Sequence, residues 1–267
     1  MSVALGIILF FFGTIIGSFL NVVIYRFHSG KSLGGRSMCF SCSKTLEWHE
    51  LVPLASFLVQ RGKCRGCKSV ISIQYPLVEA TTGVMFVFLA FKLLPVLFYS
   101  QGLFLSAVVW YTYFWCLLLV IAVYDIRHTI IPDSLVWFAN LLAFGALFAF
   151  VNFHFVPHIP SIEAIASGPL LALPFWALWY GSKGRWMGLG DAKLMLGLGW
   201  LLGLSAGLAG MVIAFWTGAI ISIILLSLRN KRYTMKSEVP FGPFLVLGGF
   251  IVFILGINFL SLSTLFM

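Results

Sequence analysis

The stretch WMGLGDAKLMLGL, residues 186–198, places one ionisable side chain, Asp191, directly in front of a long apolar run. Two glycines, Gly188 and Gly190, precede the aspartate, and we expect them to bend the backbone so that it presents the carboxylate. A charge at the edge of a membrane-spanning segment is costly, so an acid at this place is a functional candidate. The stretch therefore predicts both a membrane helix and a site at its end.

The whole chain has the composition of a polytopic membrane protein. Of its 267 residues, 61% are hydrophobic and 9% are charged, and the mean hydropathy is +1.03. Apolar runs of about 20 residues favour helices over a β-barrel, whose strands are shorter and alternate. We therefore expect an all-α membrane protein with about eight transmembrane helices. The predicted spans are 3–25, 77–99, 103–124, 134–153, 162–181, 189–204, 206–228 and 241–262.

Residues 192–228 fit either one overlong helix or two short spans, so seven spans are the alternative to eight. A single helix would be about 55 Å long, nearly twice the thickness of the hydrocarbon layer. It would also place the basic residues at 183–185 and 229–236 on opposite sides of the membrane. We therefore predict a hairpin that turns near Gly203, Ser205 and Gly207.

The basic residues predict the orientation. With eight spans, one side of the membrane carries all of the 17 lysines and arginines except Lys92 and Lys193. The positive-inside rule makes this side cytoplasmic, and both ends of the chain then face outward. The net charge of +9 suits anionic lipid headgroups. We expect no nucleic-acid partner, because no nucleic-acid-binding motif accompanies this charge.

Four cysteines lie in the first loop, as the motifs CFSC and CRGC separated by 21 residues. Two C-x-x-C turns at this separation suit a structural tetrahedral Zn(II) site, in which each turn offers two thiolates. A pair of disulfides is the alternative, but a cytoplasmic loop keeps its thiols reduced. The predicted ligands are Cys39, Cys42, Cys64 and Cys67.

The zinc site divides the chain into three predicted parts. Residues 1–25 form the first transmembrane helix, residues 26–76 a small zinc-binding loop domain, and residues 77–267 the membrane-embedded remainder. A metal explains how a polar loop of this size holds its shape with little core of its own. We expect Glu47 and Glu50 in this loop to be solvated.

Three acids fall at the predicted cytoplasmic ends of different spans: Asp125, Asp133 and Asp191. Asp133 begins the fourth span, where helix capping is the simpler explanation. Asp125 ends the third span, and capping fails there because a carboxylate opposes the dipole at a helix C-terminus. Asp191 is placed either to cap the sixth helix or to serve as a functional carboxylate. Lys193 is expected on another face of that helix, reaching towards headgroups.

Two aspartates favour acid–base chemistry over the other site types. The loop sequence WHELVP has Pro53 where a helical zinc protease needs its second histidine, and no G-x-S-x-G or phosphate-binding loop is present. Two carboxylates within hydrogen-bond reach share one proton, so the pair serves as base and acid in peptide hydrolysis. A transporter or channel that relays ions is the alternative, and it predicts acids near the bilayer midplane. A zinc-knuckle anchoring protein without chemistry is a third reading.

With these residues in hand, the chain resembles the type IV prepilin peptidases, which are membrane aspartyl proteases of the GxGD type. The resemblance runs nearly end to end and rests on several ordered motifs. They are GSFLNVVIYR (17–26), the paired C-x-x-C, RGKCRGC (61–67), YPLVEATTG (75–83), DIRHTIIPD (125–133), G-x-G-D-x-K (188–193) and PFGPFL (240–245).

The resemblance implies a two-step enzyme of the bacterial inner membrane. Asp125 and Asp191 would be the catalytic pair, supported by Asp133 and by the glycines and lysine of the G-x-G-D-x-K motif. Members remove a short basic leader from prepilins or pseudopilins at the cytoplasmic face. They often then methylate the new N-terminus with S-adenosylmethionine, a step associated with the cysteine loop and with Glu79 as a further participant.

Overall fold

The computed structural model describes residues 3–30, 32–151, 153–227, 239–259 and 261. Lys31 and the basic residues predicted to orient the loop at 229–236 lie outside this described part. The chain divides into two compact units, Met1–Lys92 and Leu93–Met267. Each unit has its own packing and is described separately.

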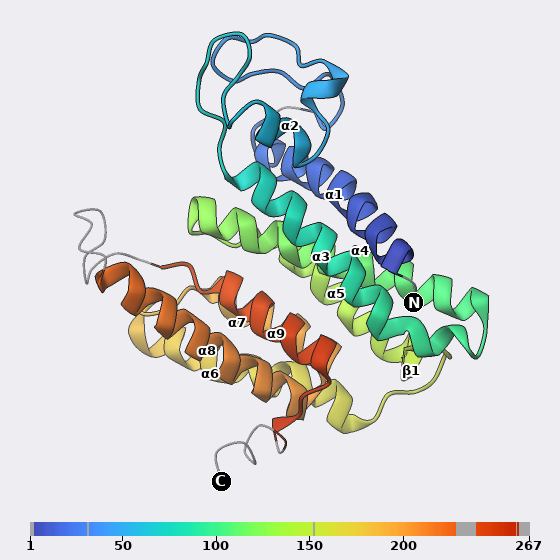
Figure 1. Cartoon of the computed structure of the whole chain (residues 1–267). Helices are drawn as coiled ribbons and strands as arrows, with labels where there is room; N and C mark the ends of the chain where they lie inside the picture. Colours follow the sequence, from blue (N-terminus) through green and yellow to red (C-terminus); the bar gives the residue numbers. More distant parts are fainter. Residues whose placement is uncertain (1–2, 31, 152, 228–238, 260, 262–267) are drawn as a thin grey trace. The chain divides into compact units, whose positions relative to one another are not determined.

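The first unit is a pair of long apolar helices joined by the cysteine loop (Figure 1). Its elements are α1 (Val3–Arg26), the short 3₁₀ helix η1 (Trp48–Glu50), α2 (Ala55–Val59) and α3 (Gln74–Leu97), whose last turn passes into the second unit.

Small residues let α1 and α3 approach closely. A Cβ atom added at Gly13 would stand 2.8 Å from the Cα of Gly83, so a larger residue would force the helices apart. At the loop end, the rings of Tyr25 and Tyr75 stack with centroids 5.0 Å apart. The buried Asn21 also donates to the Tyr75 carbonyl at 3.1 Å. The C-terminus of α1 and the N-terminus of α3 therefore lie side by side where the loop begins.

The second unit contains the remaining predicted spans as helices. Its elements are α4 (Gln101–His128), α5 (Asp133–Ala149), β1 (Phe150–Val151), β2 (His154–Phe155), α6 (Ile162–Ser182), α7 (Leu189–Leu202), α8 (Leu204–Ser227) and α9 (Gly242–Leu255). Every predicted span thus corresponds to one helix, which confirms the all-α expectation. Within the described residues, α1, α3, α4, α6 and α8 are long and apolar enough to cross a bilayer, whereas α5 and α9 are shorter apolar helices.

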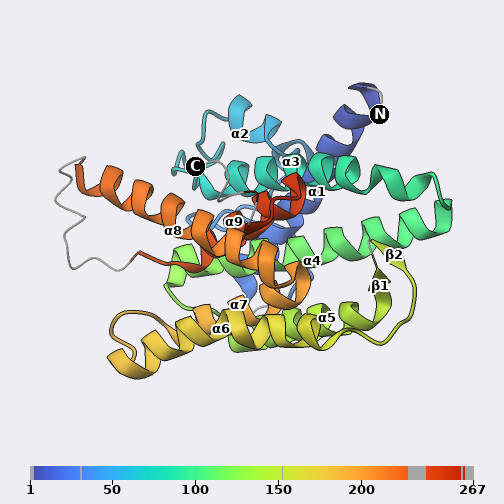
Figure 2. The same ribbon diagram turned by 90° about the horizontal axis from the view of Figure 1, so that it is seen from below.

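The predicted hairpin between α7 and α8 is present, and its turn is the single residue Gly203. This glycine has a φ of 77°, a conformation that strains other residues. The contacts of α6 give the directions: its Ser167 donates to the Gly199 carbonyl of α7 at 2.9 Å, and its Phe175 stacks on Phe215 of α8. Helices α6 and α8 run in the same direction with α7 antiparallel to both, and Figure 2 shows α6 to α9 as neighbours.

Helix α9 packs between α8 and α4 and runs antiparallel to both. On the α8 side, Gly248 lies so close to the Gly210 carbonyl that an added Cβ would overlap it. On the α4 side, Trp115 packs edge-on against Phe250, with ring centroids 4.9 Å apart. These antiparallel directions gather the C-terminus of α4 and the N-termini of α5, α7 and α9 at one end of the unit.

The close approach of α8 and α9 makes a testable prediction. Replacing Gly248 with alanine would press a methyl group against the backbone of α8, and we expect a loss of about 1–3 kcal/mol of stability from overpacking. Gly145→Ala is the matched control, since a Cβ at this helical position meets nothing within 4 Å. Thermal unfolding of the purified protein in detergent measures both variants. Equal melting temperatures would contradict the packing described here.

Candidate functional site

Asp125 lies in the last turn of α4 and is 4% exposed. Its Oδ2 atom accepts a hydrogen bond from the backbone N–H of Gly242 at 3.1 Å. Gly242 is the first residue of α9, so the carboxylate lies at a helix N-terminus, where the dipole and free N–H groups stabilise negative charge. A Cβ atom added at Gly242 would stand 2.7 Å from this Oδ2. Only glycine therefore leaves room for the carboxylate at this position.

Asp191 lies in the first turn of α7 and is 8% exposed. It does not cap its helix, because the capping residue is Gly188 and no side-chain capping hydrogen bond forms. The backbone turns from extended to helical here, but neither glycine has a positive φ, so neither adopts a conformation that only glycine favours. Gly188 is extended and Gly190 is helical; a Cβ on Gly190 would stand 2.8 Å from the Cβ of Ile131. Gly190 thus gives room to a neighbouring side chain.

The glycines next to the two buried aspartates both lie against Ile131, a residue of the α4–α5 connection that sequence reasoning did not select. The Ile131 side chain packs against Gly190 on one side and lies 3.2 Å from the Cβ position of Gly242 on the other. Gly190 precedes Asp191 in the chain and Gly242 contacts Asp125, so the two aspartates lie in the same neighbourhood. The charge of Asp125 accordingly acts on Asp191. Helices α4 and α7 reach this arrangement because each packs against both α5 and α9.

Asp133 and Lys193 form an ion pair next to this site, with Nζ 2.6 Å from Oδ1. The expected capping role of Asp133 is wrong, because Pro132 holds the cap position and Asp133 is the first residue of α5. The Lys193 ammonium group, expected to reach towards headgroups, is paired with Asp133. The pair connects the first turns of α5 and α7, although an ion pair with one exposed partner contributes only modestly to stability.

Asn140 is a residue that sequence reasoning missed. Its side chain is 2% exposed inside α5 and donates to the Lys193 carbonyl of α7 at 3.0 Å. A Cβ atom on Gly197 would overlap the Asn140 Oδ1. The glycine therefore allows α5 and α7 to approach closely here. The signal was available, since Asn140 is an amide in the middle of the apolar run 134–153 and polar residues inside spans are seldom incidental.

The four predicted zinc ligands converge in the first unit. Their sulfur atoms all lie within 4.8 Å of one another, and the sulfurs of Cys39 and Cys67 are 3.8 Å apart. Tetrahedral zinc with Zn–S bonds of about 2.3 Å would separate its sulfurs by about 3.8 Å, so the donor set fits the ion. Each of the five cysteines carries a free thiol, as the zinc interpretation requires.

The two cysteine motifs have the same backbone construction. In the first, the Cys39 N–H donates to the Lys44 carbonyl; in the second, the Cys64 N–H donates to the Ser69 carbonyl, both at 2.9 Å. Each turn also contains a residue with positive φ, Ser43 and Lys68. Equivalent turns of this kind present both sulfurs of each motif to one point.

The thiols of this cluster are electrostatically unequal. Backbone N–H groups of Cys42 and Ser41 lower the pKa of Cys39 to about 6, so its thiolate is present at neutral pH. At Cys42, the Lys44 amide lowers the pKa. Hydrogen bonds with neighbouring thiols, foremost Cys67, outweigh this effect and raise the pKa of Cys42 to about 11. Four adjacent thiols resist simultaneous ionisation, and a divalent cation would remove this resistance.

Two acids of the first unit are buried. Glu50, expected in solvent, is 6% exposed; its Oε2 accepts from the Glu47 N–H at 3.0 Å and pairs with Lys44, which together lower its pKa. Glu79 is also 6% exposed, and its Oε2 accepts the N–H of Leu54 at 2.8 Å. Both acids therefore hold the loop in place.

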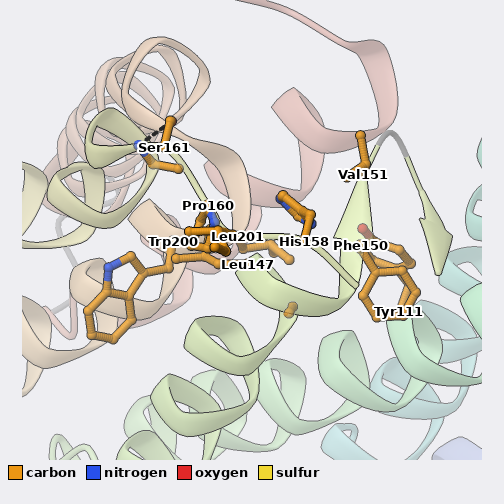
Figure 3. A pocket seen from close by; sticks show the side chains of 12 residues that line it. Tyr111, Leu147, Phe150, Val151, His158, Pro160, Ser161, Trp200 and Leu201 are labelled. Carbon is orange, nitrogen blue, oxygen red and sulfur yellow. Dashed lines mark hydrogen bonds between the residues drawn. The ribbon is translucent and has the colours of Figure 1, made fainter. Parts of the chain in front are cut away.

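A cavity of about 440 Å³ lies in the second unit, and Figure 3 shows its lining. Tyr111 of α4, Phe150, His158 and Trp200 of α7 are among the side chains around it. Tyr111 and Trp200 lie towards the ends of α4 and α7 opposite to Asp125 and Asp191. The cavity contains none of the predicted site residues, so it is separate from the aspartate pair.

Comparisons with known proteins identify the class. Residues 11–93 match the family model of the bacterial peptidase A24 N-terminal domain, and residues 112–223 match that of the type IV leader peptidase family. The chain belongs to the type IV leader peptidase family. The first match ends close to the boundary at Lys92 that separates the two compact units.

Relatives over almost the whole chain are proteins named prepilin leader peptidase/N-methyltransferase. That of Aeromonas salmonicida is 31% identical over 93% of this chain and 90% of its own length. That of Pectobacterium carotovorum is 33% identical over 92% and 90%, and that of Bacillus subtilis 30% identical over 95% and 96%. No solved structure matches the chain. Family membership and the apolar helices together indicate a multi-pass protein of the bacterial inner membrane.

The metal site makes the second prediction. Purified wild-type protein should contain about one zinc per chain, and Cys39→Ser should lose most of it, because three thiolates bind structural zinc less tightly than four. Cys116→Ser is the matched control, since Cys116 is buried inside α4, outside the cluster. Elemental analysis gives the metal content. A wild-type protein without zinc, or a Cys39→Ser variant with the full amount, would refute the site.

Proposed function

We propose that this chain is a membrane aspartyl endopeptidase that removes the short basic leader from type IV prepilins or pseudopilins and N-methylates the new N-terminus. The relatives' names and the family membership support the activity. The observation that carries the assignment to residues is that Gly190, next to Asp191, and Gly242, against Asp125, meet at Ile131, with Asp125 close enough to act electrostatically on Asp191. We infer no nucleic-acid partner.

In the proposed reaction, the two carboxylates hold one proton between them. The ionised carboxylate takes a proton from a water molecule, and the oxygen of that water attacks the carbonyl carbon of the scissile peptide bond. The protonated carboxyl group donates its proton to the carbonyl oxygen. The carboxyl group that took the proton from water then donates it to the leaving amine. As the C–N bond breaks, a hydroxyl group of the tetrahedral intermediate returns its proton to the other carboxylate, so the pair again holds one proton.

The surroundings of the two acids support different starting roles. The Gly242 N–H and the N-terminus of α9 favour the charged form of Asp125, so we assign Asp125 as the base. Asp191 also lies in the first turn of a helix, with a backbone hydrogen bond from Gly188, so its assignment as the proton donor rests on the negative charge of Asp125 that acts on it. Two negative charges in one low-dielectric site would otherwise repel each other.

Supporting residues in this proposal act by placing α7. The Asp133–Lys193 ion pair and the Asn140 hydrogen bond hold the first turns of α7 against α5. Gly188 starts the helix, and Gly190 allows Ile131 to approach it. A shift of this helix by even 1 Å would move Asp191 out of reach of the shared proton.

For the methyl-transfer step, the donor rests on the family likeness alone. S-adenosylmethionine supplies a methyl group when bound, and the resemblance associates this step with the cysteine loop and Glu79. The Glu79 Oε2 already accepts the Leu54 N–H, and the described residues around it do not identify a donor pocket. We therefore assign no step to Glu79 and propose Zn(II) as the structural ion that shapes the loop.

We further propose that the aspartate pair faces the cytoplasm. The basic first loop supports this orientation through the positive-inside rule. In domain terms, residues 1–25 anchor the loop domain 26–76, and residues 77–267 carry the peptidase. The alternative of an ion relay is not favoured, because Asp125 and Asp191 lie at helix ends and not midway along a span.

The third prediction concerns the aspartate pair. Asp125→Asn and Asp191→Asn should each lower the rate of prepilin cleavage by about 10³-fold or more, since either amide removes the shared proton. Glu163→Gln is the matched control: this exposed acid lies in the first turn of α6, at the other end of the unit. Purified protein and a prepilin in detergent suffice for the assay. Near-normal cleavage by either asparagine variant would exclude that aspartate from the pair.

The fourth prediction separates the two activities. If the zinc loop serves the second step, Cys39→Ser should reduce methylation of cleaved pilin far more than it reduces cleavage, because the aspartate pair belongs to the other compact unit. Mass spectrometry of the pilin N-terminus reads both reactions in one sample. Loss of cleavage in proportion to methylation would contradict this division.

A further inference from the structure

The segment around α2 presents apolar side chains to the outside of the first unit. Trp48, Leu58 and Val59 have exposed fractions of 81%, 73% and 70%. The neighbouring Phe57 instead turns inward, where its ring lies 3.2 Å from the Cβ position of Gly62. The loop thus has a small core, and Leu58 and Val59 are excluded from it.

A buried hydrogen bond fixes the height of this segment against α3. Leu54, the residue before α2, donates its N–H to the carboxylate of Glu79. Glu79 is five residues into α3, about 7.5 Å along the axis from Gln74. Leu54 has a φ of 58°, a value that leucine seldom adopts. Its hydrogen bond to Glu79 holds the backbone in this conformation. Figure 1 shows α2 beside the adjoining ends of α1 and α3.

This height lies near the N-terminal end of a helix that can cross a bilayer. Helix α3 is long and apolar enough to span a bilayer, and Glu79 lies inside its apolar run. A segment tied to the second turn of a spanning helix lies at the boundary between headgroups and acyl chains. Exposed leucine, valine and tryptophan side chains are favourable at that boundary and unfavourable in bulk water.

Basic residues follow α2 immediately. All four are exposed, and none forms an ion pair with an acid of the described residues. They are Arg61, Lys63, Arg65 and Lys68. Their charge fits an anionic lipid surface and repels a basic leader peptide, so charge decides between the two candidate occupants of this surface.

We propose that residues 48–59 form a membrane-docking surface, with Leu58 and Val59 inserted at the headgroup–acyl boundary and residues 61–68 on anionic headgroups. Glu79 is the positioning residue that sets the depth of this surface. The zinc turns lie in the same loop, so docking holds the metal site at the membrane face instead of leaving it free in solution. The proposal is independent of the peptidase assignment, because it involves only the first unit.

Hydrogen–deuterium exchange of the full chain in nanodiscs tests the docking. Five-residue helices exchange quickly when they are solvated, so lipid contact should be visible. We expect the amides of residues 55–60 to exchange more slowly, on the order of tenfold, in nanodiscs containing phosphatidylglycerol than in pure phosphatidylcholine. The amides of residues 39–44 in the first zinc turn should be unchanged and serve as the internal control.

Two double variants make the test specific. Leu58→Glu/Val59→Glu should abolish the lipid-dependent protection, whereas the conservative Leu58→Met/Val59→Ile should keep it. Zinc content reports whether each variant retains a folded loop. Equal exchange of wild-type residues 55–60 in the two lipids would overturn the proposal whatever the variants do. Protection that survives the glutamates in a zinc-loaded protein would overturn it as well.

Discussion

The carboxylate of Asp125 is held at the N-terminus of α9 by the Gly242 N–H, and the arrangement of the second unit depends on this contact. A carboxylate at the end of its own helix opposes the helix dipole, and burial adds a desolvation cost. Helix α9 offsets both effects by directing its own N-terminus at the charge. Asp191 lies near this negative charge, and we propose that the two carboxylates therefore hold one proton between them.

Close packing of small residues makes this convergence feasible inside a membrane. Helix α7 approaches α5 at Gly197 and α6 at Gly199, while α8 meets α9 at Gly248. Association between helices in lipid relies on such contacts and on a few buried hydrogen bonds, because burial of apolar surface gives little driving force there. Asn140 and Ser167 supply those hydrogen bonds to the backbone of α7.

The length of the apolar runs predicted the helices and the hairpin near Gly203, and the C-x-x-C spacing predicted the four-cysteine cluster, because each depends on the local sequence. The roles of Asp133 and Lys193 were beyond such reasoning: their contact joins positions 60 residues apart. The reason for a glycine at position 190 was also missed: the absence of a Cβ leaves room for the side chain of Ile131, and the sequence does not show that Ile131 lies there. The motif PFGPFL was noticed only as a resemblance, and the N–H of its glycine proves to contact Asp125.

Infrared spectroscopy of the carboxyl groups measures the central claim directly. The account predicts a protonated carboxylic C=O band at neutral pH in the wild-type protein that disappears in Asp125→Asn and in Asp191→Asn alike, since each change removes the partner that retains the proton. Bands from any other protonated acid persist in all three spectra and cancel in the differences. A band that survives unchanged in both variants, or that is absent from the wild type, would contradict the shared proton.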